Sequence, residues 1–396
     1  MSDTTSPAST ATHPAPETPE SSAVPQPAAT PRRSRGARVA RAVVVLALLV
    51  VLMVLPLYVD EFWLRTGFAV AGAIIGAVGL NLLVGTTGQL SLAHAFFLAV
   101  GAITYVYAAG EPGGTATKVD GLGLPPVVAM VLGVLVAGLC GLVFSPIAAR
   151  LRGIYLGVAS LGLVFIGQHV LNTWQSVTGG FNGRVTPEFS VLGFSFGSDT
   201  PELTILNVPF GAAERLWYLG IVLAVAAIWF ARNLVRSRPG RALQTLRDSE
   251  VAAAVMGVNV QGYKARVFLV SSMYGGLSGV LYALSIGAVA PESFSLVLSV
   301  QYLAMIVLGG LGSVYGAAVG AAFVSALPLV FQQYAGQLPL VAEPGSPGIV
   351  ASQAAAFLYG LAVVLVVLFE PAGLAGLGRR LAGAVTRRGR RTPEGP

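Results

Sequence analysis

The chain has 396 residues, of which 55% are hydrophobic and only 10% are charged. Soluble domains carry about 25% charged residues, so this composition excludes a soluble globular protein. The 24 basic residues outnumber the 17 acidic ones, for a net charge of +7. Their placement, described below, fits membrane topology better than binding to nucleic acid.

The residue types of most enzyme and metal sites are scarce. There is one cysteine, and the three histidines are too scattered for metal-ligand spacing. Neither lysine, Lys118 or Lys264, follows a glycine as a phosphate-binding P-loop requires. The segment 276–279 resembles the Gly-x-Ser-Gly pattern of intramembrane serine proteases, but no histidine follows Ser278. We therefore expect no enzyme activity, no catalytic residue, no metal site and no cofactor in this chain.

The N-terminal segment 1–31 contains seven prolines and no apolar run. Such a composition cannot bury enough surface to fold, which predicts a disordered tail. An arginine cluster ends this tail at residue 41, and the uncharged run 42–59 follows. A basic region before an apolar run is also the plan of a signal peptide, but 18 residues is long and no small-x-small cleavage site follows. We interpret 42–59 as an uncleaved first span that opens a transmembrane permease domain at 42–370.

Apolar runs separated by charges and by Gly/Pro breaks predict about ten transmembrane helices, because about 20 apolar residues span a bilayer. The expected fold is an all-α polytopic helical bundle with broken or short helices and a small extracytoplasmic loop domain. The 298–311 element is short and could be a re-entrant half-helix. The predicted helices cover 42–59, 67–85, 91–109, 126–148, 154–174, 215–231, 266–289, 298–311, 315–333 and 350–369.

The basic residues indicate the orientation of the bundle. With the N-terminus inside, 20 of the 24 Lys and Arg fall on the cytoplasmic side, leaving Arg65, Lys118, Arg184 and Arg215 outside. Basic residues are retained in the cytoplasm during insertion, so both termini, including the basic tail 371–396, are predicted to be cytoplasmic.

Two predicted loops are long. The extracytoplasmic segment 175–214 has turn signals and alternating apolar residues, which predicts a small irregular or β-rich cap. The cytoplasmic segment 232–265 is basic and contains a predicted short helix at 250–256. Asp248 or Ser249 can accept the free amide hydrogens at its start, and Gly257 suits a left-handed C-terminal cap.

Two glycine-rich breaks, 85–91 and 309–313, interrupt apolar stretches. Non-helical backbone at membrane depth requires protein or a water-filled cavity to satisfy it, and transport sites are built in such places. An ordinary tight turn, or hydrogen bonding between helices, explains these residues equally well. The predicted pathway residues are Asn81, Gln89, Ser91, His94, Gly309, Gly310 and Gly312. Small residues at four-residue spacing, such as Gly275 and Gly279, indicate close helix packing instead.

Four motifs in order resemble the branched-chain amino-acid ABC permeases, and the second favours the LivM-type subunit. They are Gly79-Leu-Asn-Leu-Leu-Val-Gly-Thr-Thr-Gly-Gln-Leu-Ser-Leu-Ala-His94; Leu151-Arg-Gly-Ile-Tyr-Leu156 with Thr178-Gly-Gly-Phe-Asn-Gly183; Gly240-Arg-Ala-Leu243 with Glu250-Val-Ala-Ala-Ala-Val-Met-Gly257; and Leu308-Gly-Gly-Leu-Gly-Ser-Val-Tyr-Gly316. The resemblance spans roughly residues 66–370. The third motif lacks the Leu-Pro that closes this loop in many importers.

The resemblance implies a permease subunit of an ABC importer in the bacterial cytoplasmic (inner) membrane. Its implied partners are a second, LivH-like permease, two cytoplasmic ATPases that bind ATP and Mg, an extracytoplasmic solute-binding protein and membrane lipid. The implied ATPase-coupling residues are Arg241, Glu250, Ala252, Ala253 and Gly257. The tentative binding-protein docking residues are Thr178, Gly179, Gly180 and Asn182.

The sequence leaves alternatives open for the substrate and for the mode of transport. Branched-chain amino acids are the expected solutes, while a related branch of the family carries urea and short amides. A stand-alone secondary transporter or channel is the alternative of another class. Ion-coupled carriers usually place an ionisable residue at membrane depth, and no Asp, Glu, Lys or Arg lies in the middle of a predicted span.

Overall fold

The computed structural model divides into two compact units, Met1–Val51 and Leu52–Pro396. In the first unit the described residues are helical and belong to the predicted first span. The predicted tail 1–41 and nearly all of the tail 371–396 lie outside the described residues. The structure describes residues 43, 46–47, 49–113, 121–151, 153–191, 193–197, 204–205, 208–334, 350–369, 373–374 and 376.

The second unit confirms the predicted all-α polytopic membrane fold, and most helix boundaries lie within a few residues of those predicted. The helical elements are η1 (Leu55–Leu57), α2 (Glu61–Thr87), α3 (His94–Ala109), α4 (Pro126–Arg150), α5 (Ile154–Thr173), α6 (Gln175–Thr178), η2 (Gly180–Asn182), α7 (Ala212–Arg236), α8 (Arg238–Asp248), α9 (Glu250–Val255), α10 (Val260–Ile286), η3 (Pro291–Phe294), α11 (Leu296–Gly309), α12 (Val314–Tyr334) and α13 (Ala351–Phe369).

Helix length separates two classes of apolar helix. In the part of the chain that the structure describes, α2, α4, α5, α7, α10 and α12 are long and apolar enough to cross a membrane. The apolar helices α3 and α11 have 16 and 14 residues. At 1.5 Å per residue they are about 24 Å and 21 Å long, short of the ~30 Å hydrocarbon core. The short α11 was expected from the 298–311 element, whereas α3 is shorter than the predicted 91–109 because it begins at His94. Each adjoins one of the two glycine breaks.

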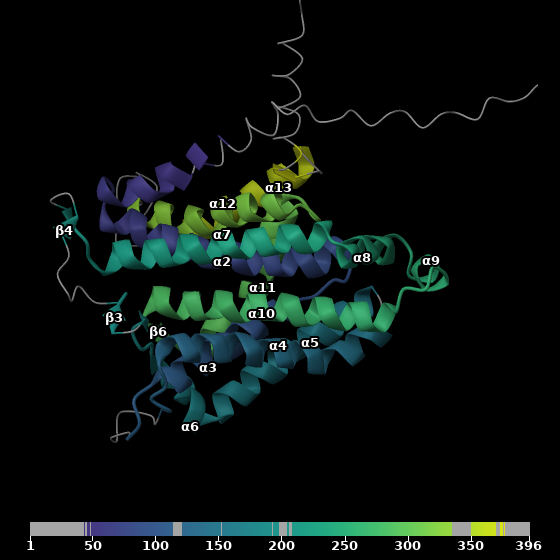
Figure 1. The fold of residues 1–396 in the computed structure, drawn as a ribbon, viewed down its shortest axis with the longest axis horizontal. Coiled ribbons are helices and arrows are strands. Elements are labelled where there is room, and N and C mark those ends of the chain that lie inside the picture. The colour runs from purple at the N-terminus through teal and green to yellow at the C-terminus, as the bar shows by residue number, and fades with distance from the viewer. Residues whose placement is uncertain are drawn as a thin grey trace, which may run out of the picture. The chain divides into compact units, whose positions relative to one another are not determined.

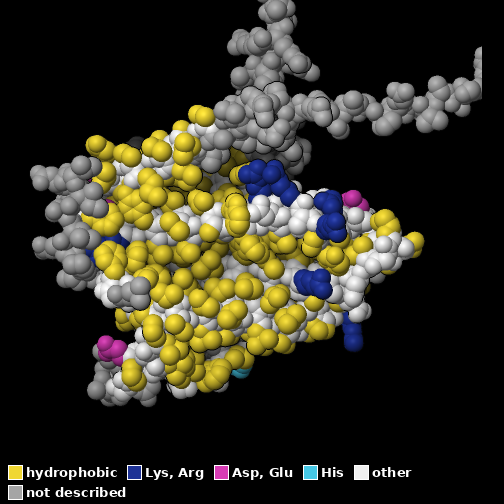
Figure 2. Space-filling model, in the orientation of Figure 1, with side chains coloured by type: hydrophobic (Ala, Val, Ile, Leu, Met, Phe, Trp, Pro, Cys, Tyr) yellow, Lys and Arg dark blue, Asp and Glu magenta, His cyan; other side chains and the backbone are white. Residues whose placement is uncertain are grey.

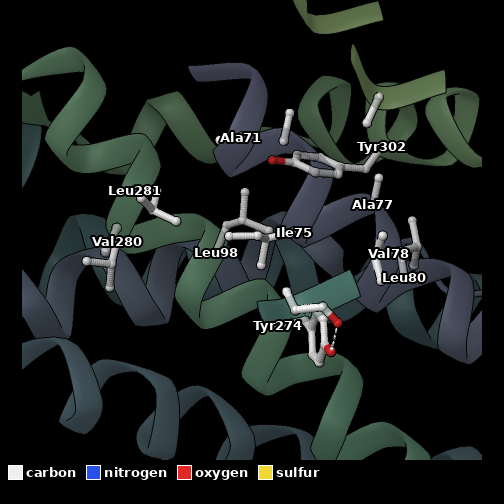
Figure 3. Close-up of a cluster of buried hydrophobic side chains, with 14 of the residues drawn as sticks. Ala71, Ile75, Ala77, Val78, Leu80, Leu98, Tyr274, Val280, Leu281 and Tyr302 are labelled. Carbon is white, nitrogen blue, oxygen red and sulfur yellow. Dashed lines mark hydrogen bonds between the residues drawn. The ribbon is translucent and has the colours of Figure 1, made fainter. Parts of the chain in front are cut away.

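Helix α10 lies at the centre of the second unit. It packs against α2, α3 and α4, while α2 also packs against α7 and α12 (Figure 1). Figure 3 shows the buried apolar side chains between α2, α3 and α10, among them Ile75, Leu98 and Leu281. Small residues permit the close approach of these helix backbones, as predicted. At Gly279, for example, an added Cβ would overlap the carbonyl oxygen of Leu98.

One end of the bundle carries short strands and is called here the strand end. The hairpins β2–β3 and β4–β5 lie within the predicted loop 175–214, so this loop is partly β-structured, as expected. The strand β1 instead pairs antiparallel with β6, which follows α10 and was not predicted. The strands are β1 (Arg184–Val185), β2 (Ser190–Val191), β3 (Phe194–Ser195), β4 (Thr204–Ile205), β5 (Val208–Pro209) and β6 (Ala288–Val289).

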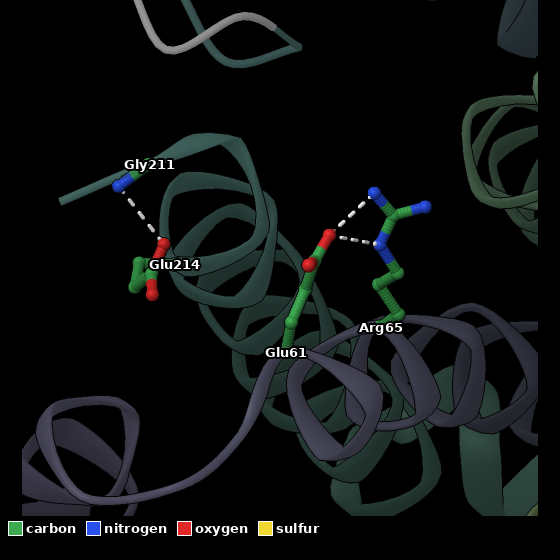
Figure 4. A network of polar contacts seen from close by, with 4 residues as sticks. All are labelled: Glu61, Arg65, Gly211 and Glu214. Atoms are coloured by element: carbon green, nitrogen blue, oxygen red, sulfur yellow. Dashed lines mark hydrogen bonds and ion pairs between the residues drawn. The ribbon is translucent and has the colours of Figure 1, made fainter. Parts of the chain in front are cut away.

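Polar contacts fix the helix starts at the strand end. Glu61 opens α2 and accepts a hydrogen bond from Arg65, one turn on, at 2.7 Å. Glu214 in the first turn of α7 accepts from the backbone N–H of Gly211 at 2.9 Å. Figure 4 shows both pairs. Acidic side chains in a first turn also interact favourably with the positive end of the helix dipole.

The opposite end carries α8 and α9 and is called here the α8–α9 end. Sequence analysis predicted one short helix in this loop, whereas the structure has two, because Ser237 and Pro239 start α8 ahead of it. Both helices project beyond the long helices (Figure 1). Figure 2 shows apolar side chains covering the long helices and most of the visible Lys and Arg gathered toward the α8–α9 end.

Candidate coupling and solute-pathway sites

The short helix α9 is built as the sequence predicts. Its N-cap is Ser249, whose Oγ accepts a hydrogen bond from Ala252 N at 3.2 Å. Beyond its C-terminus, Gly257 has φ +80° and donates its N–H to Ala254 O at 3.0 Å. This left-handed glycine turns the chain toward Asn259, which caps α10 by accepting from Gly262 N at 2.9 Å. The turn between α9 and α10 is therefore set by local chemistry.

A polar pair fastens α9 to the bundle. Lys264 Nζ lies 2.7 Å from Glu250 Oε1, and the lysine side chain is only 1% exposed. Glu250 is thus turned toward α10. Of the other predicted coupling residues, Ala253 is fully buried, whereas Ala252 and Arg241 are exposed.

The exposed side of α9 and the residue that follows it are apolar, which the sequence analysis did not single out. Val251, Val255 and Met256 are 68%, 84% and 64% exposed. Helix α9 forms the tip of the α8–α9 end (Figure 1), where Figure 2 shows hydrophobic side chains at the surface. An apolar cluster with a polar rim is typical of a protein-interaction surface. The sequence signal that could have identified it is the uninterrupted apolar run 251–256 in a predicted cytoplasmic loop helix.

Gly257 offers a test of the turn. We expect Gly257→Val to destabilise the turn by about 1–2 kcal/mol, because a β-branched side chain is strained at positive φ. A Cβ there meets no atom within 4 Å, so crowding makes no contribution. Gly257→Asn is the matched control, since asparagine tolerates this conformation. Hydrogen exchange of the α9 amides measures the difference, and equal protection in the two variants would contradict it.

The first glycine break covers 88–93 and not the predicted 85–91, because α2 continues to Thr87 and Gly88 ends it with φ +70°. Side chains of two other helices accept hydrogen bonds from this break and from the first turn of α3. Leu92 N donates to Ser160 Oγ of α5 at 2.8 Å, and Ala95 N donates to Ser299 Oγ of α11 at 2.9 Å. Ser91 is buried, and its Oγ accepts from Ala93 N at 3.4 Å. Side-chain hydroxyls therefore satisfy the amides of Leu92 and Ala93 in the break, the kind of pairing that irregular structure at membrane depth requires.

The second glycine break, 310–313, packs directly against the end of α2. Gly312 N donates to Asn81 Oδ1 at 2.9 Å. A Cβ added at Gly85 would lie 2.5 Å from Gly312 N, so the second break meets the last turn of α2 backbone to backbone. Gly309 ends α11 against α12, where a Cβ would overlap the carbonyl of Gly316. The structure thus brings the second break against the helix end that leads into the first break, which sequence spacing could not show.

Three predicted pathway side chains are buried without a partner on some polar atoms. The structure gives no hydrogen-bond partner to Asn81 Nδ2, to His94 Nε2 or to the side-chain amide atoms of Gln89. His94 packs edge-on against Tyr302, with ring centroids 5.0 Å apart. Tyr302 OH in turn lies 2.9 Å from Ser278 Oγ, which donates to Gly72 O at 2.8 Å. Tyr302 and Ser278 were not among the predicted pathway residues.

A cavity of about 660 Å³ opens at the strand end above Tyr302. Its wall follows α2 from Phe62 to Ala73, a depth of about 16 Å at the helical rise. The lining is mostly apolar, with a few polar groups that include Gln301 and Ser285. Its size is within the range of small-molecule sites. The predicted pathway residues do not line this cavity, and His94 lies against the ring of Tyr302, which does.

The predicted docking residues form a compact turn at the strand end. Thr178 is buried, and its Oγ1 donates to Leu171 O at 2.7 Å and accepts from Gly180 N at 3.0 Å. Gly179 and Gly180 both have positive φ. Of the four predicted residues, only Asn182 is exposed; its neighbour Phe181 is 74% exposed. The motif therefore holds the turn together and presents two side chains.

The chain matches a protein family described as the permease component of the branched-chain amino acid transport system, over residues 63–368. The match covers most of the chain, including both glycine breaks and α9. The chain belongs to this family.

Individual relatives agree with this family assignment. The chain is 30% identical to the high-affinity branched-chain amino acid transport system permease protein LivM of Escherichia coli K12 and to that of Salmonella typhimurium LT2, over 63% of this chain and 58% of each relative. It is 23% identical to a probable LivM of Methanocaldococcus jannaschii, over 80% of this chain and 89% of that relative. The chain thus spans little more than half the length of the two bacterial relatives. No solved structure matches significantly.

Proposed function

We propose that this chain is the membrane-spanning permease subunit of an ABC importer in a bacterial inner membrane. The supporting observation is the exposed apolar tip of α9, formed by Val251, Val255 and Met256, outside a bundle of apolar helices. An ATP-driven importer whose permease has no P-loop needs ATPases in other subunits, and this tip offers a contact for a cytoplasmic ATPase. The proposed assembly contains two such ATPases, a LivH-like second permease and an extracytoplasmic solute-binding protein.

The cavity at the strand end supports a solute chamber in this subunit. With the α8–α9 end in the cytoplasm, the cavity opens to the side from which an importer receives solute. Tyr302, hydrogen-bonded to Ser278, forms its floor about halfway along α2, where its ring lies against Gly76. The glycine breaks and His94 lie on the other side of that floor. Closure of the ATPases would move α8 and α9, and alternating access would open the path from the chamber past the breaks.

The strand end also offers a surface for the solute-binding protein. Trp174, Phe181 and Asn182 are exposed there beside the buried turn at Thr178. Aromatic side chains at such positions are frequent anchors of protein interfaces. We propose that these exposed residues make the contact, while Thr178, Gly179 and Gly180 shape the turn.

Branched-chain amino acids are the proposed solutes. The relatives carry that name, and the mostly apolar lining of the cavity suits an aliphatic side chain. Urea and short amides are the competing class within this proposal. In such a system the solute-binding protein makes the first selection, so its ligand preference decides between them.

Affinity purification of the tagged chain from its native membranes in mild detergent tests the assembly. Recovery of an ATPase pair, a second permease and a binding protein supports the proposal, and titration of that binding protein with leucine and with urea identifies the solute. Recovery of the chain alone, under conditions that preserve a known ABC complex, together with uptake by the chain alone in liposomes, would favour a stand-alone carrier.

The tip of α9 gives a direct test of ATPase docking. We expect Val255→Asp to remove the ATPases from the purified complex, because a charge placed in the centre of an apolar contact costs about 2 kcal/mol or more. Quantitative mass spectrometry of the purified complex measures the loss. Gln244→Asp adds the same charge to exposed α8 and should retain the ATPases. Equal ATPase recovery in both variants would exclude this tip as the docking site.

A further inference from the structure

The guanidinium of Arg247, near the C-terminus of α8, reaches the end of α2. Its Nη1 donates to Gly85 O at 2.6 Å. That oxygen is one of the last carbonyls of α2, which lack partners within the helix. A cation at a helix C-terminus also interacts favourably with the helix dipole. Arg247 therefore caps α2 from a different segment of the chain.

The same guanidinium lies against the second glycine break. A Cβ added at Gly312 would be 3.2 Å from Arg247 Nη1 and 3.2 Å from Gly85 O. Gly312 N donates a hydrogen bond to Asn81 Oδ1, one turn before Gly85 on α2. One side chain of α8 thus contacts the point where the second break meets the end of α2.

The rest of α8 is well placed to transmit movement to this contact. Leu243 and Leu246 are buried, and Leu243 packs in a cluster with Leu83 of α2 and Phe268 of α10. Helix α9 follows α8 after a single residue, Ser249, and the ion pair between Glu250 and Lys264 joins it to α10. A polar cavity of about 210 Å³ lies between α9 and the first break, lined by Gln89, Arg247 and Glu250 among others.

We propose that Arg247 is the positioning residue that transmits displacement of the coupling helices α8 and α9 to the contact between the end of α2 at Gly85 and the second glycine break at Gly312. This inference rests on the proposed function. When α9 is pushed, α8 carries the guanidinium with it, and the hydrogen bond at Gly85 O pulls the end of α2 away from Gly312. Loss of this contact leaves the ATPases attached and active but uncouples ATP hydrolysis from opening of the solute path.

The test uses the complete complex in liposomes, with uptake and ATP hydrolysis measured on one preparation. Arg247→Met keeps the length of the side chain and removes its charge and its donors. We expect it to lower uptake per ATP hydrolysed at least about tenfold, a typical coupling effect, with complex yield and ATP hydrolysis within about twofold of the unmodified protein. Arg247→Lys, which keeps a cationic donor, should restore part of the uptake. Gln244→Ala, on exposed α8, is the control and should leave the ratio unchanged.

A second measurement follows the break itself. With Cys140→Ser and Leu90→Cys, a water-soluble maleimide reports the accessibility of exposed Leu90 in the first break. We expect ATP to change the labelling rate when Arg247 is present and to leave it unchanged in Arg247→Met.

The outcomes separate the two proposals. An unchanged ratio of uptake to hydrolysis in Arg247→Met, with a normal labelling response, would overturn the role of Arg247. A parallel loss of yield, hydrolysis and uptake would also overturn it, since it indicates a merely structural residue. If the unmodified complex shows no ATP-dependent uptake, the importer proposal itself fails.

Discussion

Gly279→Leu is expected to prevent the bundle from packing. Gly279 lies on α10 where the backbone of α3 crosses it, and a Cβ there would overlap the backbone oxygen of Leu98. Overpacking within a core costs about 1–3 kcal/mol, and more when the obstacle is backbone that cannot rotate away. The α3–α10 contact lies in the core shown in Figure 3. We expect little monodisperse protein after extraction and a lowered Tm for what remains.

The matched control is Gly162→Leu, which makes the same change on α5. No atom lies within 4 Å of a Cβ at Gly162. The added side chain would face the surroundings of the bundle, where leucine is favourable in a lipid-exposed helix. Expression and Tm should stay close to those of the unmodified protein. If both variants show the same expression and the same Tm, the two glycines do not differ in packing as the structure indicates.

The sequence predicted those parts of the fold that depend on local rules. Uncharged runs located the helices, because the bilayer fixes their length and polarity. The cap at Ser249 and the left-handed Gly257 followed from short-range hydrogen bonding and sterics. The two glycine breaks were located to within a few residues for the same reason, since clustered glycine and polar residues between apolar runs are visible along the chain.

Features that depend on distant segments were not predicted. The pairing of β1 with β6 joins residues about 100 positions apart, and two-residue strands carry no periodic signal. The contact of Arg247 with Gly85 spans 162 positions, so nothing in the loop separates this arginine from its basic neighbours. The cavity above Tyr302 is formed by several helices together. These are the properties on which the site depends most.

Glu250 shows how a motif residue can be recognised while its contact is missed. The resemblance implied an ATPase-coupling role for it, and in the structure its carboxylate pairs with buried Lys264. A buried ion pair contributes little net stability, but removal of one partner leaves a buried charge uncompensated. The pairing suggests that Glu250 orients α9 so that Val251, Val255 and Met256 face outward.

Glu250→Gln is therefore expected to destabilise the α8–α9 end strongly. It leaves the Lys264 ammonium, 1% exposed, without its counter-charge, and the cost is about 3 kcal/mol, at the lower end for buried pairs because Glu250 is partly exposed. Transport should fall with it, since α9 loses its attachment to α10. Lys264→Met should cost less, because the glutamate that remains is 24% exposed and keeps some hydration.

The double variant Glu250→Gln/Lys264→Met decides whether the pair acts as a unit. It removes both charges, so we expect it to be more stable than Glu250→Gln alone, a non-additivity typical of residues in direct contact. Reversible unfolding in mixed detergent micelles gives the free energies, and uptake by the assembled complex gives the functional counterpart. Strict additivity of the two single effects would mean that the ion pair does not hold α9. Recovery of stability without recovery of uptake would instead assign Glu250 a contact with the ATPase beyond its structural one.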